Sequence, residues 1–257
     1  MQDESLDDAT LAGSLVRRAG DLASRMLASG VESSQKSSRG DLVTAADRAA
    51  EQMVVDLLSR ARPADGVVGE EDAARQGTSG RTWFVDPVDG TYNFVHGLPW
   101  WCSALALQEA DEVLLGAVHH TEGDDTWVGG RDLPTTRNGV QLPRLGDRDL
   151  EDCSVATYLH LDYFSDADVQ EPFAAVASGA KAVRSGGSGS MDLAAVADGR
   201  LDLWCQRDAE RWDWMPGFAL VEGVGGTTAH LTVRGHTWSL AGPATAVGRA
   251  IRLLQQA

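Results

Sequence analysis

The segment WFVDPVDGTYNF, residues 83–94, restricts the fold of this chain more than any other. Its first three residues are bulky and apolar, which is typical of a buried strand. Asp86 and Asp89 then follow three residues apart, and Gly90-Thr91 offers a place where a helix can begin. The fold must therefore carry two carboxylates where a buried strand ends, unless Asp-Pro-x-Asp-Gly is a plain turn, since each of those residues is turn-prone.

Carboxylates placed in this way suit a hard cation. Mg²⁺ prefers oxygen ligands from carboxylates, backbone carbonyls and water. Two aspartates on either side of Pro87-Val88 can direct both carboxylates and the Val88 carbonyl toward one point. The backbone N–H groups of Gly90 and Thr91, at a helix start, can hold a phosphate. Together these groups suit metal-assisted phosphoryl chemistry.

Further acidic residues stand in comparable places. Glu70 and Glu71 follow a short apolar stretch, residues 66–68, and Asp213 stands at the start of a predicted helix. Asp47 lies three residues after Thr44, a plausible N-cap, so it can also be no more than the acid of a capping box.

The bulk properties limit the classes of partner. The 257 residues, 43% hydrophobic and 23% charged, suffice for a full core. A formal net charge of −16 argues against nucleic acid and anionic membranes as partners. No apolar run approaches the roughly 18 residues of a membrane span, and the acidic N-terminus lacks the apolar core of a signal peptide. The three cysteines show no zinc spacing. A cytoplasmic protein is expected.

Hydrophobic periodicity predicts helices and strands that alternate in blocks, which indicates a layered α/β or α+β protein. Asn138-Gly139 is predicted to be a tight turn. Helices are predicted over Asp8–Ser29, Thr44–Ala61, Val169–Ser178, Ser190–Asp198, Asp213–Glu222 and Ala244–Gln255. Strands are predicted over Thr82–Val85, Ser103–Gln108, Val113–His119, Thr126–Gly129, Cys153–Tyr158, Ala182–Ser185, Leu201–Cys205, Gly226–Thr232 and Thr237–Ala241.

Five motifs, in order along the chain, resemble those of the inositol monophosphatase family. DPVDGTYNF resembles its DPxDGTxNF signature. KSSRGDLVTAAD, GEED, RSGGSGSMDLAAVADGRLDLW and WDWMPGFALVEGVGG resemble its K-x-x-x-D-x-V-T-x-x-D, G-E-E, R-x-x-GS…DL…VA-x-GR-x-D and W-D-x-x-x-G…EAGG elements. They extend from about Lys36 to Gly226, so a chance turn does not explain them.

The resemblance implies an α+β fold, a layered αβαβα sandwich like that of inositol monophosphatase and fructose-bisphosphatase. Residues 1–257 would form a single domain with an N-terminal half, residues 1–145, and a C-terminal half, residues 146–257. The implied activity is Mg²⁺-dependent hydrolysis of a phosphomonoester, with two to three Mg²⁺ ions. The family also implies a homodimer and sensitivity to lithium.

The resemblance also implies roles for individual residues. The first metal ion would be held by Glu70, Asp86 and the Val88 carbonyl, and the second by Asp86, Asp89 and Asp213. Thr91, hydrogen-bonded to Asp47, would with Glu70 orient the attacking water. The residues that would contact the substrate are Asp89, Gly90, Thr91, Gly187, Ser188, Gly189, Gln206 and Asp213.

The expected substrate is inositol monophosphate or a similar small polyol or sugar phosphate. Gln206 stands where the family often has a glutamate that hydrogen-bonds inositol hydroxyls, so one charge is missing. Gly189 and Ser190 stand where alanines are common. Histidinol phosphate and 3′(2′),5′-bisphosphate nucleotides remain alternative substrates. A non-catalytic relative that binds metal is the alternative from another class, although the chain has every implied metal ligand.

Overall fold

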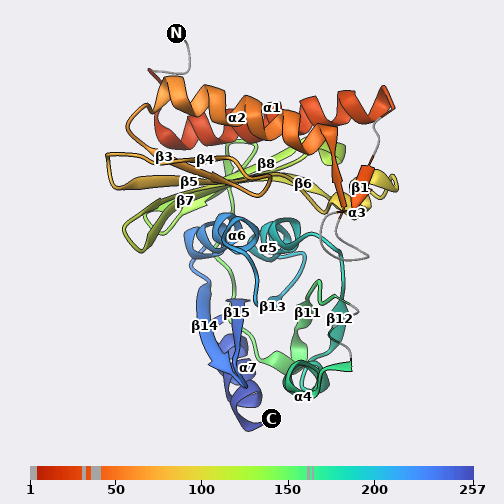
Figure 1. The fold of residues 1–257 in the computed structure, drawn as a ribbon. Helices are drawn as coiled ribbons and strands as arrows, with labels where there is room; N and C mark the ends of the chain where they lie inside the picture. Colours follow the sequence, from red (N-terminus) through yellow and green to blue (C-terminus); the bar gives the residue numbers. More distant parts are fainter. Residues whose placement is uncertain (1–4, 31–32, 36–41, 161–162, 164) are drawn as a thin grey trace.

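The computed structural model describes residues 5–30, 33–35, 42–160, 163 and 165–257. Helices and sheets alternate in five layers (Figure 1), which confirms the αβαβα sandwich. One helix pair covers the outer face of a large sheet, a second pair lies between two sheets, and a third covers the far face of the smaller sheet. In that order the pairs are α1 (Asp8–Ala28) with α2 (Ala45–Ala61), α5 (Gly189–Ala197) with α6 (Arg211–Gly223), and α4 (Ala167–Ser178) with α7 (Ala244–Gln256). Lys36, where the first family-like motif begins, lies outside the described residues.

The larger sheet has eight strands, of which only β3 and β5 pair in parallel among the described residues. In spatial order they are β10 (Val140–Gln141), β9 (Leu133–Arg137), β8 (Asp125–Gly130), β7 (Glu112–His120), β6 (Cys102–Glu109), β5 (Arg81–Asp89), β3 (Gly66–Gly69) and β4 (Ala74–Arg75).

The smaller sheet has five strands, and β11 is parallel to both of its neighbours. In spatial order they are β12 (Ala182–Arg184), β11 (Ser154–Ala156), β13 (Leu203–Arg207), β15 (His236–Gly242) and β14 (Thr227–Val233). A two-stranded ladder, β1 (Ser33–Gln35) with β2 (Leu42–Thr44), precedes α2, and the short helix α3 (Thr91–Val95) follows β5.

Strand β5 is buried on both faces because it lies between two helical layers. Successive side chains of a strand point to opposite faces. Trp83 and Val85 pack with α1 and α2, whereas Phe84 packs with Met215 of α6 on the other face. By the same alternation Asp86 lies on the α6 side of the sheet. The strand therefore directs its first aspartate toward the middle helical layer.

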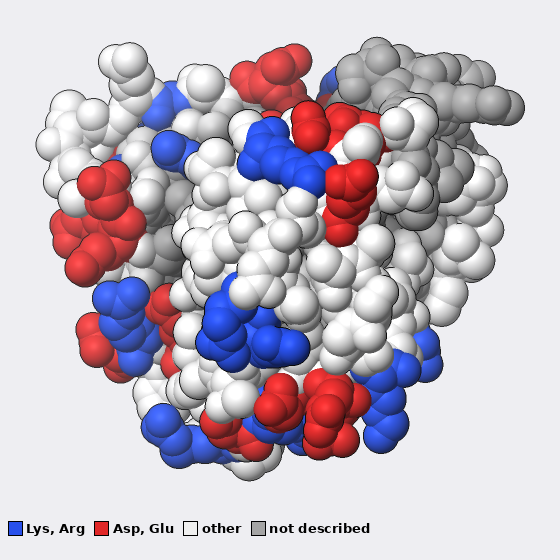
Figure 2. All heavy atoms as spheres, turned by 90° about the horizontal axis from the view of Figure 1, so that it is seen from below, with Lys and Arg blue, Asp and Glu red and all other residues white. Residues whose placement is uncertain are grey.

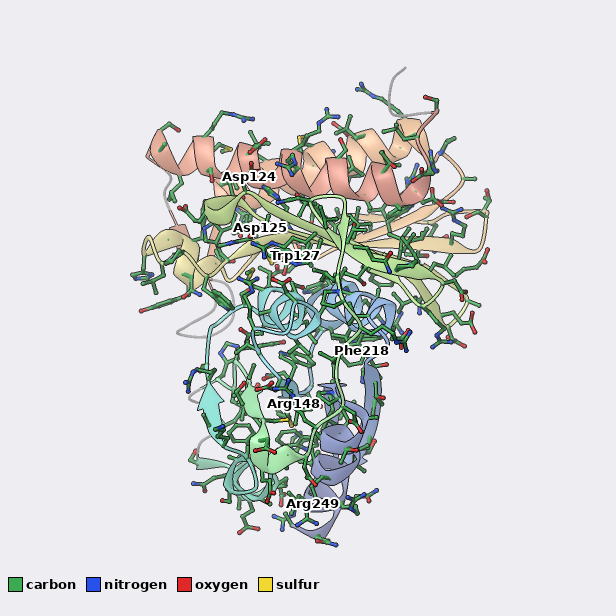
Figure 3. The ribbon with its side chains drawn as sticks, turned by 180° about the vertical axis from the view of Figure 1, so that it is seen from behind. Asp124, Asp125, Trp127, Arg148, Phe218 and Arg249 are labelled. Carbon is green, nitrogen blue, oxygen red and sulfur yellow. The ribbon has the colours of Figure 1, made fainter. Side chains whose placement is uncertain are left out.

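The middle layer is a core of large aromatic and aliphatic side chains. Trp127 on β8, Trp204 on β13 and Phe218 on α6 belong to one buried cluster. Figure 3 shows Trp127 at the first sheet and Phe218 on the opposite side of the middle helices, where its ring lies 6.0 Å from that of Trp204. Residues from both halves of the chain therefore share one core.

The end of β5 differs from its prediction. The strand does not stop at Val85 but continues to Asp89, so the plain-turn interpretation of Asp-Pro-x-Asp-Gly is wrong. Its pairing with β6 shifts register between Asp86 and Asp89. Pro87 lies in this irregular stretch, where its missing N–H is tolerated.

Five short strands, β1, β2, β4, β9 and β10, were not predicted, because each is brief and carries little alternation, and β3 was expected only as a short apolar stretch. The turn predicted at Asn138-Gly139 is confirmed, and it connects β9 to β10. Both residues have positive φ, 51° and 78°, as a two-residue hairpin turn requires.

The distribution of charge on the surface and the apolarity of the helices limit the kinds of partner. Seen from below, acidic and basic side chains are interspersed, so the acidic excess of the chain is not gathered into one patch on this face (Figure 2). Within the described residues, every helix falls short of the length and apolarity that crossing a bilayer demands.

Candidate active site

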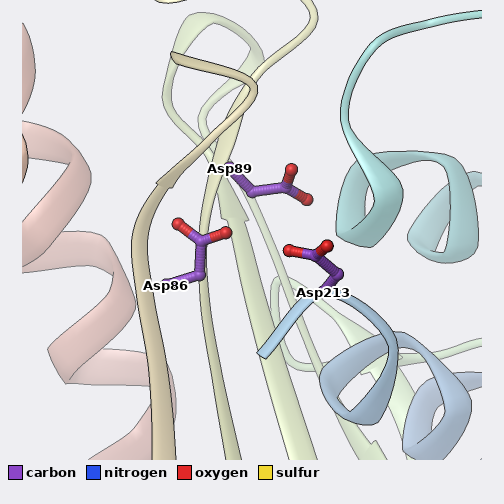
Figure 4. A group of neighbouring side chains, drawn as sticks. All are labelled: Asp86, Asp89 and Asp213. Carbon is purple, nitrogen blue, oxygen red and sulfur yellow. The ribbon is translucent and has the colours of Figure 1, made fainter. Parts of the chain in front are cut away.

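Three aspartates meet where β5 approaches the middle helical layer. Asp86 and Asp89 extend from β5, and Asp213 extends toward them from the first turn of α6 (Figure 4). One carboxylate oxygen from each lies within 4.8 Å of the others. We call these three residues the acidic centre. Residues more than 120 positions apart in the sequence thus form one possible ligand set for a cation.

Hydrogen bonds from different parts of the fold orient the three carboxylates. Asp86 Oδ1 accepts from the backbone N–H of Val88, 3.0 Å away, within the irregular end of β5. Asp89 Oδ2 accepts from the backbone N–H of Ser190 in the first turn of α5, at 2.6 Å. Asp213 Oδ2 accepts from the hydroxyl of Tyr158, at 2.7 Å. Each carboxylate is therefore oriented by a different element of the fold.

Electrostatic repulsion adds to burial at the acidic centre. Burial, and then the charges of neighbouring carboxylates, raise the pKa of Asp86 and of Asp213 well above the usual range. Burial also raises the pKa of Asp89 to about 6, against the opposing effect of the Ser190 N–H bond. Within the described residues, no Lys or Arg forms an ion pair with any of the three.

This donor set fits a hard divalent cation. Buried carboxylates are costly unless a positive charge compensates them. Oxygen donors from aspartates are the ligands that Mg²⁺ prefers, and the set contains no sulfur or imidazole that would favour a softer metal.

Glu70 lies directly after β3, beside the acidic centre. Its backbone N–H donates to the carbonyl of Val85 over 3.1 Å. The charge of Glu70 contributes to the raised pKa of Asp86 and of Asp47, after burial in each case. The structure thus brings Glu70 close to the acidic centre, although its carboxylate is not part of the group within 4.8 Å.

Thr91 and Asp47 join α3 to α2 at the side of the acidic centre. The Thr91 hydroxyl lies 3.2 Å from Asp47 Oδ1 and 3.1 Å from the Val88 carbonyl, so the hydrogen bond expected between Thr91 and Asp47 is present. Asp47 also completes the capping box of α2 with Thr44. The capping interpretation and the site interpretation of Asp47 are therefore both compatible with the structure.

The glycine-rich segment before α5 lies against the start of α3. A Cβ at Gly90, whose φ is 92°, would lie 3.1 Å from the Cβ of Ser188 and 3.2 Å from the Gly187 carbonyl. Ser188 caps α5 by accepting from the backbone N–H of Met191 at 3.3 Å. The RSGGSGS segment thus brings Gly187 and Ser188 close to Gly90.

Gln206 is buried near the end of β13, and its side chain is hydrogen-bonded to the two residues that follow the neighbouring strand β11. Its Oε1 accepts from the Thr157 hydroxyl at 2.8 Å and from the Tyr158 N–H at 3.0 Å. The structure connects Gln206 to the acidic centre through Tyr158.

Two residues that the sequence analysis did not select lie close to this site. Tyr158 donates to Asp213, and Asp192 of α5 accepts from Trp100 Nε1 at 2.8 Å while its Oδ2 has no hydrogen-bond partner. Burial raises the pKa of Asp192 to about 7. Asp192 is the aspartate of the DL element in a family-like motif, a signal to which the sequence analysis gave no role, whereas Tyr158 lies outside these motifs and reaches the site only through the pairing of distant strands and helices.

Known proteins resemble this chain in sequence and in fold. The profile of the inositol monophosphatase family matches residues 7–254. An inositol-1-monophosphatase from Rhizobium meliloti is 35% identical over 201 residues, which cover 76% of this chain and 75% of that protein. A fructose-1,6-bisphosphatase/inositol-1-monophosphatase from Thermotoga maritima is 32% identical over 186 residues, 72% of this chain and 70% of that protein.

A solved structure of the extragenic suppressor protein SuhB from Bartonella henselae superposes with a TM-score of 0.85 at 27% identity, covering 95% of this chain and 96% of that one. Its likeness extends over nearly the whole five-layer fold. With the family profile matched almost end to end and the acidic residues of the family-like motifs gathered at one point, the chain belongs to the inositol monophosphatase family of phosphatases.

Proposed function

We propose that the chain is a Mg²⁺-dependent phosphomonoesterase that hydrolyses inositol monophosphate or a similar small polyol or sugar phosphate. The observation that carries this proposal is the acidic centre, whose three converging carboxylates have no positive partner among the described residues. The names of two relatives, an inositol-1-monophosphatase and a fructose-1,6-bisphosphatase/inositol-1-monophosphatase, support the substrate class.

The three carboxylates that converge at the acidic centre support an assignment of metal ligands. Asp86, Asp89 and Asp213 would hold Mg²⁺, with Glu70 and the Val88 carbonyl completing the set for two to three ions. Bound divalent cations supply stabilisation of charge on phosphate oxygens and activation of water. The carboxylates of the chain hold that chemistry at the end of β5, where burial strengthens electrostatic interactions.

The attacking water would be oriented by Thr91 and Glu70. When the Thr91 hydroxyl donates its proton to Asp47, its oxygen lone pairs remain to accept a hydrogen bond from water. Glu70 can accept a hydrogen bond from the second O–H of that water. Asp47 thus acts through Thr91, whose hydroxyl it directs.

The phosphate would be bound at the start of α3. The N–H groups of Gly90 and Thr91 stand in the first turn of that helix, where backbone donors have no partner within the helix. Gly90 adopts a left-handed conformation, so a non-glycine residue there would be strained and would also approach Ser188. Gly187, Ser188 and Gly189 would form the adjacent wall of the substrate site.

The test is phosphate release with and without Mg²⁺ from inositol-1-phosphate, fructose-1,6-bisphosphate, histidinol phosphate and 3′-phosphoadenosine-5′-phosphate. We expect turnover that requires Mg²⁺ and is highest with a polyol or sugar phosphate. A clear preference for histidinol phosphate or for the nucleotide would reject the substrate class and keep the mechanism. No turnover of any of the four, although Mg²⁺ binds, would reject the catalytic function. Sedimentation of the same sample would test the expected homodimer.

A further inference from the structure

Tyr158 connects the acidic centre to Gly189, one of the residues proposed above as the wall of the substrate site. It follows β11, and its hydroxyl donates to Asp213 Oδ2 at 2.7 Å. Its half-buried ring packs against Gly189. A Cβ at that glycine would lie 2.8 Å from Tyr158 Cε1, which is closer than real Cβ contacts allow. The ring thus occupies the space that a side chain at position 189 would need.

Gln206 fixes the backbone that carries this tyrosine. Strands β11 and β13 run parallel, with Ala156 opposite Trp204. Just beyond this pair, Gln206 Oε1 accepts from the Thr157 hydroxyl and from the Tyr158 N–H. These two bonds use both lone pairs of the amide oxygen. That oxygen therefore places Tyr158 and has no lone pair left for a hydroxyl of a substrate.

We propose that Tyr158 is a positioning and selectivity-determining residue, whose phenol holds Asp213 in place and uses one of the two lone pairs of Asp213 Oδ2, which leaves one fewer for a hydroxyl of the leaving group. The inference rests on the proposed phosphomonoesterase function and narrows its substrate class. Of two oxygens that could recognise a polyol, Gln206 Oε1 has both lone pairs used within the protein, and Asp213 Oδ2 has one of its two used. Compared with a site in which these oxygens were free, this site should favour phosphate esters whose leaving groups carry few hydroxyl groups.

The hydrogen bond to Asp213 also bears on metal binding. A carboxylate that is oriented by a donor on one oxygen presents the other oxygen in a fixed direction. Loss of such an outer partner commonly lowers metal affinity about tenfold or more. The Tyr158 hydroxyl should therefore affect cation binding even when no substrate is present.

The first test compares Tyr158→Phe with Tyr163→Phe at saturating Mg²⁺. Tyr163 is a matched control, because its ring contacts Arg207 and His160 and lies in a different core cluster. For each variant, kcat/KM is measured with inositol-1-phosphate and with phenyl phosphate, which has no hydroxyl on its leaving group. Mg²⁺ affinity is measured separately by calorimetry on the substrate-free protein.

Tyr158→Phe should raise the ratio of kcat/KM for inositol-1-phosphate to that for phenyl phosphate about tenfold, because a further lone pair of Asp213 Oδ2 becomes available to a hydroxyl. It should also weaken Mg²⁺ binding, while Tyr163→Phe changes neither quantity. An equal loss for both esters, with the ratio unchanged, would overturn the selectivity role, and unchanged Mg²⁺ affinity would overturn the positioning role. Absence of turnover of both esters by the wild type would overturn the proposed function, and this inference with it.

The second test asks whether the ring and residue 189 share one space. Gly189 does not have a positive φ, so its backbone accepts alanine. Gly189→Ala should lower kcat/KM for both esters in the wild type, because the new Cβ displaces the ring, and should have little effect when Tyr158 is already alanine. Equal losses in the two backgrounds would show that the two positions are independent and would overturn the steric part of the proposal.

Discussion

Two groups of aspartates lie in or beside the layer between the sheets, and their electrostatics are opposite. In the acidic centre, Asp86, Asp89 and Asp213 face one another without an arginine or lysine among the described residues. In the second group, beside Trp127, Arg137 contacts Asp125 Oδ2 at 2.7 Å and Asp198 Oδ2 at 3.1 Å (Figure 3).

The second group is neutralised by the protein itself. Arg200 adds a further contact to Asp198 at 3.0 Å, and the guanidinium groups of Arg137 and Arg200 lie 5.6 and 5.4 Å from the centre of the Trp127 ring. Although burial raises the pKa of Asp125, the hydrogen bond and charge of Arg137 outweigh it and lower that pKa. In the acidic centre the pKa values are raised instead. The aspartates whose negative charge is not compensated by an arginine or lysine of the described residues are thus the ones suited to bind an external cation.

The largest contrast should be in turnover. Asp89→Asn removes one charge from the acidic centre while keeping an oxygen that can accept the Ser190 N–H bond. We expect the rate of Mg²⁺-dependent phosphate release to fall at least ~10³-fold, because metal ions contribute several kcal/mol of charge stabilisation. Asp125→Asn is the matched control and should keep its activity. Wild-type turnover in Asp89→Asn would refute the assignment of the acidic centre.

The next effect is the stabilisation of the folded state by Mg²⁺. A ligand that binds only the folded state at 100 times its Kd adds about 2.7 kcal/mol to the free energy of unfolding. We expect a gain of this size in the wild type and in Asp125→Asn, and almost none in Asp213→Asn. Urea denaturation with Mg²⁺ and with a chelator measures it. Equal gains in all three proteins would place the cation elsewhere.

The third effect is the stability of the second group. Asp125→Asn breaks a bidentate contact with Arg137 and should lower the free energy of unfolding by about 1–2 kcal/mol, since a partly exposed arginine limits the loss. In the metal-free protein Asp89→Asn should have the opposite sign, because it relieves repulsion. Chemical denaturation in a chelator compares the two, and the same sign in both variants would argue against the contrast.

The sequence was most informative where local chemistry decides the structure. The capping box of Thr44 and Asp47 and the Asn138-Gly139 turn each depend on neighbours a few residues apart, and both are present. The family-like motifs also placed Asp86, Asp89 and Asp213 together. The extension of β5 to Asp89 was missed, because β6 supplies the pairing partner for the irregular end of that strand.

Contacts between distant segments explain what the sequence could not predict. Tyr158 and Gln206 lie 48 residues apart and meet through the parallel pairing of β11 and β13. The Arg137–Asp198 contact spans 61 residues. Nothing in the local pattern of either segment distinguishes an aspartate that will meet an arginine from one that will meet other aspartates. Only the packing of α5 and α6 against the first sheet separates the two groups.

The smallest predicted effect is the pH dependence of stability in the metal-free protein. Whether stability rises or falls with pH distinguishes the two groups of aspartates. Burial raises the pKa of Asp89 from 3.8 to about 6 in the folded state, so between these values the folded state binds more protons than the unfolded state. The free energy of unfolding should therefore fall as pH rises from about 4 to about 6, and Asp86 and Asp213, whose pKa values burial and neighbouring carboxylates raise well above the usual range, should add to the fall. Asp125 has a lowered pKa, so its contribution is present above its unfolded pKa and is lost only as pH falls toward more acidic values.

Urea denaturation at several pH values in a chelator measures this slope, and Asp89→Asn should make it shallower, whereas Asp125→Asn should leave it unchanged between pH 5 and 6. Mg²⁺ should abolish the fall, because cation binding requires ionised carboxylates and displaces their protons. A metal-free protein whose stability rises across this window would mean that its acidic centre is already compensated from within, like the group beside Trp127, and the contrast between the two groups would be lost.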